Sequence, residues 1–225
     1  PAAAGVARVI AMILAAGQGE RLRPLTETTP KALVEVRGRS LLERHLDSLK
    51  AAGIETVVIN LGWLGEMIAD RIGSGHAYGL NVVYSQEGEN ILETGGGIHR
   101  ALPMLGREPF LVVNADVYTD MPLPPAGLAE TDVGHLVLVP RPAHKPQGDF
   151  DLQDGRVCES RNAAHTFSGV AVYRPEFFAG CEPGRFPLAP MLKAAAREGR
   201  LAGSLYEGLW EDVGAPERLA DLNRP

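Results

Sequence analysis

The sequence is poor in cysteine, and its two cysteines stand far apart. Cys158 and Cys181 have neither the spacing of a metal-binding pair nor that of a redox motif. We therefore expect two free thiols, as in a protein of the reducing cytoplasm. Metal-spaced histidines are lacking as well. The six histidines form no such pair, and His45 and His99 fall within predicted helices as packing or surface residues.

Long apolar runs and basic runs are equally absent from the sequence. No apolar stretch approaches the length that spans a bilayer, and residues 1–5 lack the basic flank of a secretory signal. The formal net charge of −6 argues against a nucleic-acid-binding surface. We expect a cytoplasmic protein with no membrane and no nucleic-acid partner, present as a monomer or a weak dimer.

Predicted strands and helices alternate along the first 120 residues. Buried strands are predicted where apolar, β-branched runs occur, and helices where apolar residues recur at helical spacing. Such alternation is typical of a mostly parallel sheet with right-handed crossovers and helices on both faces. The strands are predicted at 9–14, 56–59, 81–84 and 110–114, and the helices at 41–52, 66–72 and 94–105.

The pattern changes after residue 120. Three prolines between Met121 and Pro125 exclude a helix there, and Asp154-Gly155 is typical of a hairpin turn. At 225 residues we expect a single α/β domain, a doubly wound, Rossmann-like mixed sheet with a small antiparallel lobe after residue 120. In this second half, strands are predicted at 135–139, 149–152, 156–159 and 166–173, and helices at 190–198 and 217–222.

The loop after the first predicted strand carries the strongest functional signal. Small residues around Gly17 and Gly19 let backbone N–H groups approach an anion, and Arg21 and Lys31 add positive charge. The loop is not a P-loop, because no Gly-Lys-Ser/Thr follows. It is not a dinucleotide fingerprint either, because Leu22 stands where that fingerprint needs glycine or alanine, and the next strand ends at an asparagine. The loop therefore suits a triphosphate better than a neutral metabolite.

This loop, closed by Pro30-Lys31, and further motifs resemble those of the sugar-1-phosphate nucleotidyltransferases. The resemblance extends over nearly the whole chain. It implies one nucleotidyltransferase domain, in which residues 1–120 bind the nucleotide and residues 121–225 bind the sugar. We expect no C-terminal β-helix domain and no fused acetyltransferase activity. The other motifs that carry the resemblance are Glu93-Thr94-Gly95-Gly96-Gly97, Asn114-Ala115-Asp116, Gly148-Asp149-Phe150, Phe167-Ser168-Gly169 and Trp210-Glu211-Asp212-Val213-Gly214.

The implied chemistry requires a divalent cation. A sugar-phosphate oxygen must attack the α-phosphorus of a nucleoside triphosphate, and like charges repel along that approach. Mg²⁺ usually takes one or two carboxylates, with phosphate oxygens and water as its other ligands. Asp116, at the carboxyl end of a buried strand, and Asp212, between an aromatic residue and a glycine turn, are the candidates. The alternatives are that Asp116 is a turn former and that Asp212 caps the last helix.

The resemblance also implies which residues contact the nucleotide. Lys31, on spacing alone an ordinary exposed lysine, takes the role of the family lysine at the phosphates, and Arg21 contacts the triphosphate. With the two aspartates they form the expected catalytic set Arg21, Lys31, Asp116 and Asp212. Gln86 is either a reader of uracil or part of a polar loop, and residues 93–97 either lie against the base and ribose or form a flexible entry loop. The expected nucleotide-binding residues are Ala15, Ala16, Gly17, Gly19, Glu20, Arg21, Lys31, Gln86, Glu93, Thr94 and Gly95.

The sugar side is matched by position only. Asn114, Asp149, Ser168 and Gly169 are the expected sugar-binding residues, although Asp149 is equally a carboxylate at a hairpin edge. Glucose-1-phosphate thymidylyltransferases carry a lysine in a Glu-Lys-Pro context that neutralises the sugar phosphate, and this chain has none there. The departure argues against that branch and leaves the partner of the sugar phosphate unassigned.

Within the family, Glu93-Thr94 matches the branch with muramyl substrates better than the mannose-1-phosphate guanylyltransferases. The resemblance therefore implies Mg²⁺-dependent transfer of UMP from UTP to N-acetylmuramic acid 1-phosphate in peptidoglycan recycling. The enzymatic alternatives are a mannose-1-phosphate guanylyltransferase and a glucose-1-phosphate nucleotidyltransferase. A non-catalytic nucleotide-sensing module is the alternative of another class, and the intact loop argues against it. No residue is identified as a reader of the lactyl carboxylate.

Overall fold

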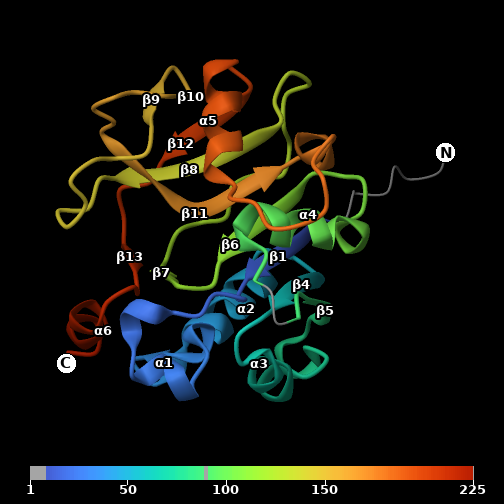
Figure 1. Ribbon diagram of the computed structural model, residues 1–225, viewed down its shortest axis with the longest axis vertical. Coiled ribbons are helices and arrows are strands. Elements are labelled where there is room, and N and C mark those ends of the chain that lie inside the picture. The colour runs from blue at the N-terminus through green and yellow to red at the C-terminus, as the bar shows by residue number, and fades with distance from the viewer. Residues whose placement is uncertain (1–8, 89–90, 225) are drawn as a thin grey trace.

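The computed structural model describes residues 9–88 and 91–224, and it contains one large mixed sheet with helices packed on it (Figure 1). Residues 1–5, judged above for a secretory signal, lie outside the described part. The helices are α1 (Leu25–Thr28), α2 (Leu41–Ala51), α3 (Gly65–Ile72), α4 (Glu93–Leu105), α5 (Ala189–Arg197) and α6 (Pro216–Leu222). The strands are β1 (Ile10–Leu14), β2 (Glu35–Val36), β3 (Arg39–Ser40), β4 (Thr56–Leu61), β5 (Asn81–Gln86), β6 (Phe110–Asn114), β7 (Val117–Thr119), β8 (Gly134–Pro140), β9 (Asp151–Gln153), β10 (Arg156–Cys158), β11 (His165–Tyr173), β12 (Leu201–Leu205) and β13 (Trp210–Asp212).

The first half of the chain forms the parallel part of the sheet. Strands β4 and β6 both pair in parallel with β1, and β5 pairs in parallel with β4. In the order β5-β4-β1-β6, the topological switch point, at which the strand order reverses, lies between β1 and β6. In open sheets of this kind, ligands bind outside the carboxyl ends of the strands at that point.

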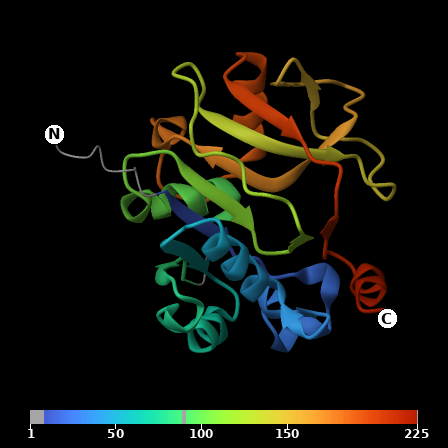
Figure 2. The same cartoon turned by 180° about the vertical axis from the view of Figure 1, so that it is seen from behind.

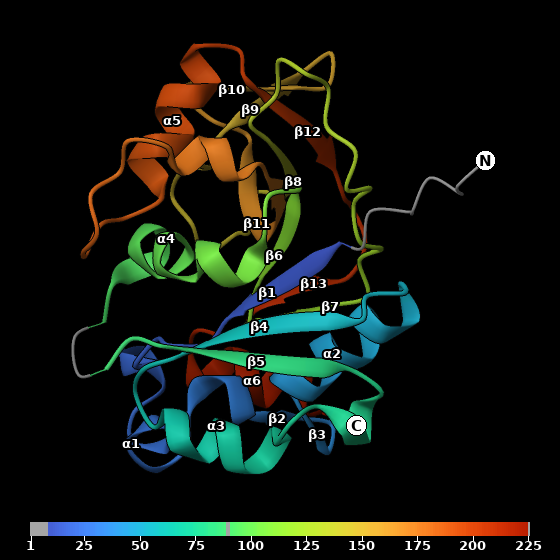
Figure 3. The ribbon, with the colours of Figure 1, turned by 90° about the vertical axis from the view of Figure 1, so that its right-hand side faces the viewer.

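Helices cover both faces of this sheet, as alternating strands and helices predict. Figure 3 shows α4 on one side of β1, β4 and β5, and α2 and α3 on the other. Two separate apolar cores result. One contains Leu42 and Leu46 of α2 with Ile68 of α3, and the other contains Ile98 of α4 with Leu192 of α5. The expected doubly wound arrangement is confirmed.

The second half extends the sheet mostly, but not entirely, with antiparallel strands. Strand β11 pairs antiparallel with β6 and β8, and β9 and β10 form the expected hairpin. Both turn residues, Asp154 and Gly155, have positive φ. The antiparallel extension is present as expected, and the exception is β12, a strand that was not predicted and that pairs in parallel with β8. Helix α5 connects β11 to β12, and these two strands lie on either side of β8 and run in opposite directions.

Two short sheets were not predicted from the sequence, whereas the last helix, α6, lies where it was predicted. Strands β13 and β7 pair antiparallel, as do β2 and β3. The α6 end of the chain returns to the β2–β3 hairpin, beside the early part of the chain (Figure 2). There the Asn223 side chain accepts from Arg37 N at 2.7 Å and donates to Glu35 O at 3.3 Å. No helix among the described residues has both the length and the apolar character that a membrane crossing requires.

Candidate functional site

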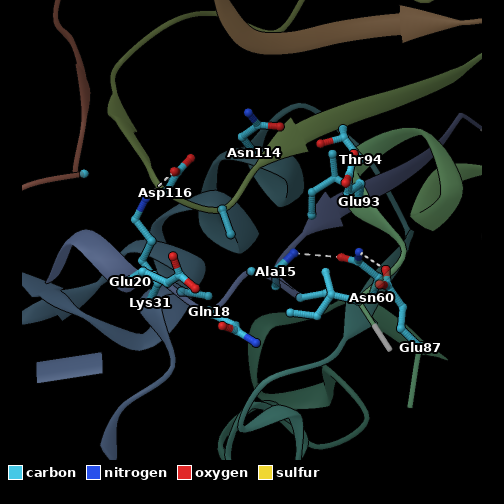
Figure 4. Close-up of a pocket in the computed structure, with 18 of the residues that line it drawn as sticks. Ala15, Gln18, Glu20, Lys31, Asn60, Glu87, Glu93, Thr94, Asn114 and Asp116 are labelled. Atoms are coloured by element: carbon cyan, nitrogen blue, oxygen red, sulfur yellow. Dashed lines mark hydrogen bonds and ion pairs between the residues drawn. The ribbon is translucent and has the colours of Figure 1, made fainter. Parts of the chain in front are cut away.

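A cavity of about 1010 Å³ opens at the carboxyl ends of β1, β4 and β6. Ligands of open parallel sheets bind at the topological switch point, which here lies between β1 and β6. Figure 4 shows Lys31 and Glu20 on one side of it, Glu93 and Thr94 on the other, and Asn114 between them. Of the residues expected from the sequence, those that line the cavity are Ala15, Ala16, Gly17, Gly19, Glu20, Arg21, Lys31, Glu93, Thr94, Asn114 and Asp116.

The glycine loop is shaped by its second glycine and by a buried threonine. Gly19 has a φ of +63°, and a Cβ added to it would lie 2.9 Å from the Thr26 Cγ2 atom, so only glycine fits without strain. The Thr26 hydroxyl donates to Gly19 O at 2.8 Å, and Thr26 is only 1% exposed. Gly17, by contrast, has no atom within 4 Å of such a Cβ. The loop is therefore fixed at Gly19 and open at Gly17, where a phosphate would need close access to the backbone.

Lys31 and Asp116 form an ion pair at the edge of this loop. The Lys31 ammonium donates to Asp116 Oδ2, and the two side chains are 14% and 32% exposed. Lys31 therefore is not the ordinary exposed lysine of the alternative interpretation. Beneath the pair, burial lowers the pKa of His45 to about 4 despite the nearby Asp116 carboxylate. His45 is consequently neutral at pH 7, and the positive charge at this place comes from Lys31.

Asp212 pairs with Val117, the residue after Asp116, across the β7–β13 sheet, but lies outside the cavity lining. Val213 N donates to Asp116 O at 2.8 Å, so the β13 turn is tied directly to Asp116. Asp212 Oδ2 lies 3.3 Å from an Arg218 nitrogen, and Oδ1 lies 3.5 Å from His144 Nε2. Oδ1 is buried and has no hydrogen-bond partner among the described residues. Asp212 does not cap α6, because the N-cap residue there is Ala215.

The two aspartates fit a divalent cation that has oxygen ligands. Among residues 9–88 and 91–224, no group of three or more His, Cys, Asp or Glu side chains is arranged to hold a metal. A cation here would thus depend on two carboxylates and on oxygens from substrate and water, which is the usual coordination of Mg²⁺. The buried Asp212 Oδ1 without a partner is the kind of atom that such an ion would satisfy.

Sequence reasoning missed Asn60 and Glu87, which both line the cavity. Asn60 Oδ1 accepts from Ala15 N at 2.7 Å, and Asn60 Nδ2 donates to Glu87 Oε1 at 2.6 Å. Glu87 Oε2 accepts from Leu92 N at 2.8 Å. This buried chain of hydrogen bonds joins the start of the glycine loop, the end of β4 and the start of α4. The neighbouring Gln86, expected as a uracil reader, is exposed and does not line the cavity.

The glycines of α4 lie against a segment from the second half of the chain. A Cβ on Gly95 would lie 2.5 Å from the Phe186 ring, and one on Gly96 would lie 2.2 Å from Gly184 O. Gly95 is buried and is not part of the cavity lining. Residues 183–187, called the 183–187 segment below, also bring Arg185 to the cavity wall. Arg185 was not among the expected site residues, because nothing in its own sequence context indicates this contact.

The expected sugar-binding residues are divided between the cavity and the structure behind it. Asn114 lines the cavity, and a Cβ on Gly169 would lie 2.7 Å from Asn114 Nδ2. Gly169 has a φ of +83° and sits where the β11 register shifts. Ser168 is 1% exposed, and its hydroxyl accepts from Val170 N at 3.1 Å. Asp149 accepts from Lys145 Nζ at 3.2 Å and from Phe167 N at 3.0 Å, away from the cavity lining.

Comparison with known proteins agrees with this arrangement. The family model described as "Nucleotidyl transferase" matches residues 10–147. The chain is 50% identical, over 94% of its own length and 95% of the relative's, to an N-acetylmuramate alpha-1-phosphate uridylyltransferase of Neisseria meningitidis. It is 37% identical, over 92% and 93%, to a protein of the same name from Caulobacter vibrioides. A putative glucose-1-phosphate thymidylyltransferase from Bacillus anthracis has the same fold, with a TM-score of 0.83 at 19% identity, covering 96% of this chain and 94% of that one.

Proposed function

The chain belongs to the nucleotidyl transferase family, and from that premise we propose that it transfers UMP from UTP to N-acetylmuramic acid 1-phosphate. The observation that carries the transfer is the cavity in which an open glycine loop, Arg21 and Lys31 lie beside Asp116. The choice of substrates is supported by the 50% identity to a uridylyltransferase named for them, over nearly the full length of both chains.

The reaction is a single displacement at phosphorus. An oxygen of the sugar phosphate attacks the α-phosphorus of UTP, a new P–O bond forms, and the bond to the bridging oxygen breaks to release pyrophosphate. The attacking phosphate is an anion at neutral pH, so no residue has to remove a proton from it. The protein must instead position two anions and neutralise their charge.

Arg21 and Lys31 supply fixed positive charge to the phosphates. Arg21 presents a planar guanidinium that can bind two phosphate oxygens, whereas Lys31 acts as a point charge. The ion pair with Asp116 holds the Lys31 ammonium at the end of β6. Loop residues Ala15, Ala16, Gly17, Gly19 and Glu20 line the same cavity, and backbone N–H groups of such a loop can bind phosphate oxygens. The N–H of Ala15 already donates to Asn60 Oδ1.

Asp116 and Asp212 are the proposed ligands of Mg²⁺. When bound, the ion would neutralise charge on the reacting phosphates. Arg218 pairs with Asp212 Oδ2, and the backbone hydrogen bond from Val213 N to Asp116 O joins the segments that carry the two aspartates. These contacts let the chain present both carboxylates before any substrate arrives.

The two halves of the domain divide the substrates between them in this proposal. Residues 1–120 bind the nucleotide, with Glu93 and Thr94 toward the base and ribose, whereas residues 121–225 bind the sugar. Glu87 is better placed than Gln86 to face the nucleotide, because it lines the cavity and Gln86 does not. Asn114 is the proposed direct contact to the sugar, and Asp149, Ser168 and Gly169 support the sugar side from outside the cavity lining. Gly95, predicted on the nucleotide side, supports that side through its contact with Phe186. A role in peptidoglycan recycling in the cytoplasm follows from the substrate and agrees with the two free cysteines.

The proposal is tested by nucleotide binding and by sugar competition. In thermal-shift measurements with Mg²⁺, UTP should stabilise the protein more than GTP or dTTP, because only binding to the folded state raises stability. With UTP fixed, N-acetylmuramic acid 1-phosphate should give a higher kcat/KM than the 1-phosphates of N-acetylglucosamine, glucose or mannose. Stronger stabilisation by GTP would assign the protein to the mannose branch. Equal use of glucose 1-phosphate would retain the nucleotidyltransferase but remove the recycling role.

A further inference from the structure

We propose that Arg185 binds the carboxylate of the acidic sugar and so sets the preference for N-acetylmuramic acid 1-phosphate. The inference rests on the proposed function and adds to it the group that reads the lactyl substituent. That substituent is the only chemical difference between this substrate and N-acetylglucosamine 1-phosphate. A protein that prefers the acidic sugar therefore needs a cation at the place where the lactyl group lies.

The cavity contains few cations that could take this role. Among the described residues that line it, the basic side chains are Arg21, Lys31 and Arg185. Arg21 and Lys31 belong to the glycine-loop side, where the triphosphate carries its charge. Arg185 pairs with Glu93, and Figure 4 shows Glu93 and Thr94 across the cavity from Lys31 and Glu20. Arg185 thus brings a guanidinium to the wall opposite the glycine loop, where Glu93 offsets part of its charge.

The 183–187 segment holds the Arg185 backbone firmly against α4. Phe186 N donates to Leu92 O, and Gly96 N donates to Phe186 O, both at 3.1 Å. The Phe186 ring packs on Gly95 and lies edge-on to His99, with 5.9 Å between the ring centroids. The segment runs beside α4 on the way from β11 to α5 (Figure 3). A side chain on Gly95 or Gly96 would displace it, so these glycines serve to bring Arg185 to the cavity.

The Arg185 guanidinium keeps its two terminal nitrogens available for a ligand. Only Nε is engaged, by donation to Glu93 Oε1 at 2.8 Å, and no other partner lies on this guanidinium within the described part of the chain. The Arg185 side chain is 71% exposed, so a carboxylate can approach it. Two parallel N–H groups match the two oxygens of a carboxylate. Glu93 orients the guanidinium through its Nε and leaves the two terminal nitrogens for the substrate.

Lys145 is the competing cation on the sugar side, but it is already engaged. Its ammonium lies 3.2 Å from Asp149 Oδ2, and neither residue lines the cavity. Asp149 also accepts from Phe167 N at 3.0 Å, so this ion pair is held outside the cavity lining. The geometry therefore favours Arg185, and Lys145 provides the comparison for the test.

The test compares two sugars on the same protein. We would measure kcat/KM with UTP for N-acetylmuramic acid 1-phosphate and for N-acetylglucosamine 1-phosphate, and take their ratio for the wild type, Arg185→Gln, Arg185→Lys and Lys145→Gln. Arg197→Gln is the matched control, because Arg197 is also exposed and also paired with a glutamate, Glu159, but lies away from the cavity lining. Thermal unfolding establishes that each variant is folded.

The expected result is a loss of muramyl preference of about 10- to 100-fold in Arg185→Gln, the range for charge-assisted hydrogen bonds. The kcat/KM ratio of Arg185→Lys should lie between those of the wild type and Arg185→Gln, because lysine keeps the positive charge but lacks the two parallel N–H groups of the guanidinium. Arg197→Gln should keep the wild-type ratio. Equal losses for both sugars in Arg185→Gln, or a changed ratio in Lys145→Gln alone, would overturn the assignment. A wild type with no preference for the muramyl substrate would instead refute the proposed substrate before any variant is compared.

Discussion

Replacing Gly96 by alanine tests whether the 183–187 segment is seated on α4 as described. Gly96 is buried, and its added Cβ would lie 2.2 Å from Gly184 O and 3.1 Å from the Leu92 Cβ. The nearest obstacle is a backbone carbonyl and not the end of a flexible side chain. The segment must therefore move away from the helix to admit a single methyl group.

The magnitude follows from three opposing effects. Alanine stabilises a helix interior by about 1 kcal/mol relative to glycine, whereas forcing a methyl group into a packed contact costs about 1–3 kcal/mol. The shift also strains the two hydrogen bonds that join Phe186 to Leu92 and Gly96, each contributing about 0.5–1.5 kcal/mol. The net loss is about 2 kcal/mol, and for a protein of this length it lowers Tm by roughly 4–8 °C.

Thermal unfolding of Gly96→Ala beside Gly127→Ala measures this effect. Gly127 is exposed and has no atom within 4 Å of an added Cβ, so its alanine variant should stay within about 0.5 kcal/mol of the wild type. A Tm for Gly96→Ala equal to or above that of the wild type would mean that helix propensity alone decides the outcome. The contact between α4 and the 183–187 segment would then be refuted, and with it the positioning of Arg185.

Three further predictions concern single carboxylates. Asp116→Asn should keep the fold and reduce pyrophosphate release on the order of a hundredfold or more, because the amide keeps the shape but loses the charge that would hold a cation. A rate near that of the wild type would contradict a metal site at Asp116. Although burial opposes it, hydrogen bonds from Ser40, Tyr78 and Arg71 lower the pKa of Glu43 from 4.5 to about 2. A depressed carboxyl pKa stabilises the fold above pH 4.5 and ceases to do so as pH falls toward 2, so Glu43→Gln should lower the free energy of unfolding at pH 7 by on the order of 3 kcal/mol. In urea titrations, the difference in free energy of unfolding between the wild type and Glu43→Gln should narrow between pH 5 and 3. A difference that stays constant with pH would contradict the lowered pKa of Glu43. Glu87→Gln should place an amide N–H against a donor at Asn60 or Leu92, lower stability by about 1–3 kcal/mol and weaken UTP binding in calorimetry, whereas unchanged affinity would remove Glu87 from the nucleotide site.

The elements that the sequence predicted correctly are those with a periodic apolar pattern. Residues 56–59 and 110–114 are apolar runs that form the buried strands β4 and β6, and residues 41–52 form α2 to within one residue. The position of Asp116 followed from its place after β6, because strand ends in a parallel sheet meet at one edge. The apolar pattern of a segment was sufficient to predict it wherever that segment lies in the large sheet or packs directly on it.

Pairings between short segments could not be predicted in this way. Strands β2, β3, β7 and β13 have two or three residues each, too few for a period to appear. The parallel pairing of β12 with β8 joins segments about sixty-five positions apart in the chain, and residues 201–205 alone do not indicate it. The neighbours of Gly95 and Gly96, Phe186 and Gly184, lie about ninety positions further along the chain, and no local pattern reveals them.

The choice between Gln86 and Glu87 shows a signal that was available and went unused. Side chains alternate along β5 and its continuation, so that Ser85 is 0% exposed, Gln86 is exposed and Glu87 is 7% exposed. Strand alternation alone therefore turns residue 86 away from the side of residue 87. What the alternation does not supply is the partner, since Asn60 is twenty-seven positions away.

The end of β6 joins the two substrate sides of the cavity mechanically. Asn114 and Asp116 lie within two residues of each other; Asp116 pairs with Lys31 of the nucleotide side, and Asn114 closely approaches Gly169 of β11. The antiparallel pairing of β6 with β11 fixes this approach. A larger residue at Gly169 would push on Asn114, and through the short turn on Asp116, so its effect should appear in kcat as well as in sugar binding. Arg185 has no such connection to the reacting centre, because its segment is anchored on α4. A substitution at Arg185 should therefore change the discrimination between sugars without changing the chemical step, whereas a substitution at Gly169 should change both.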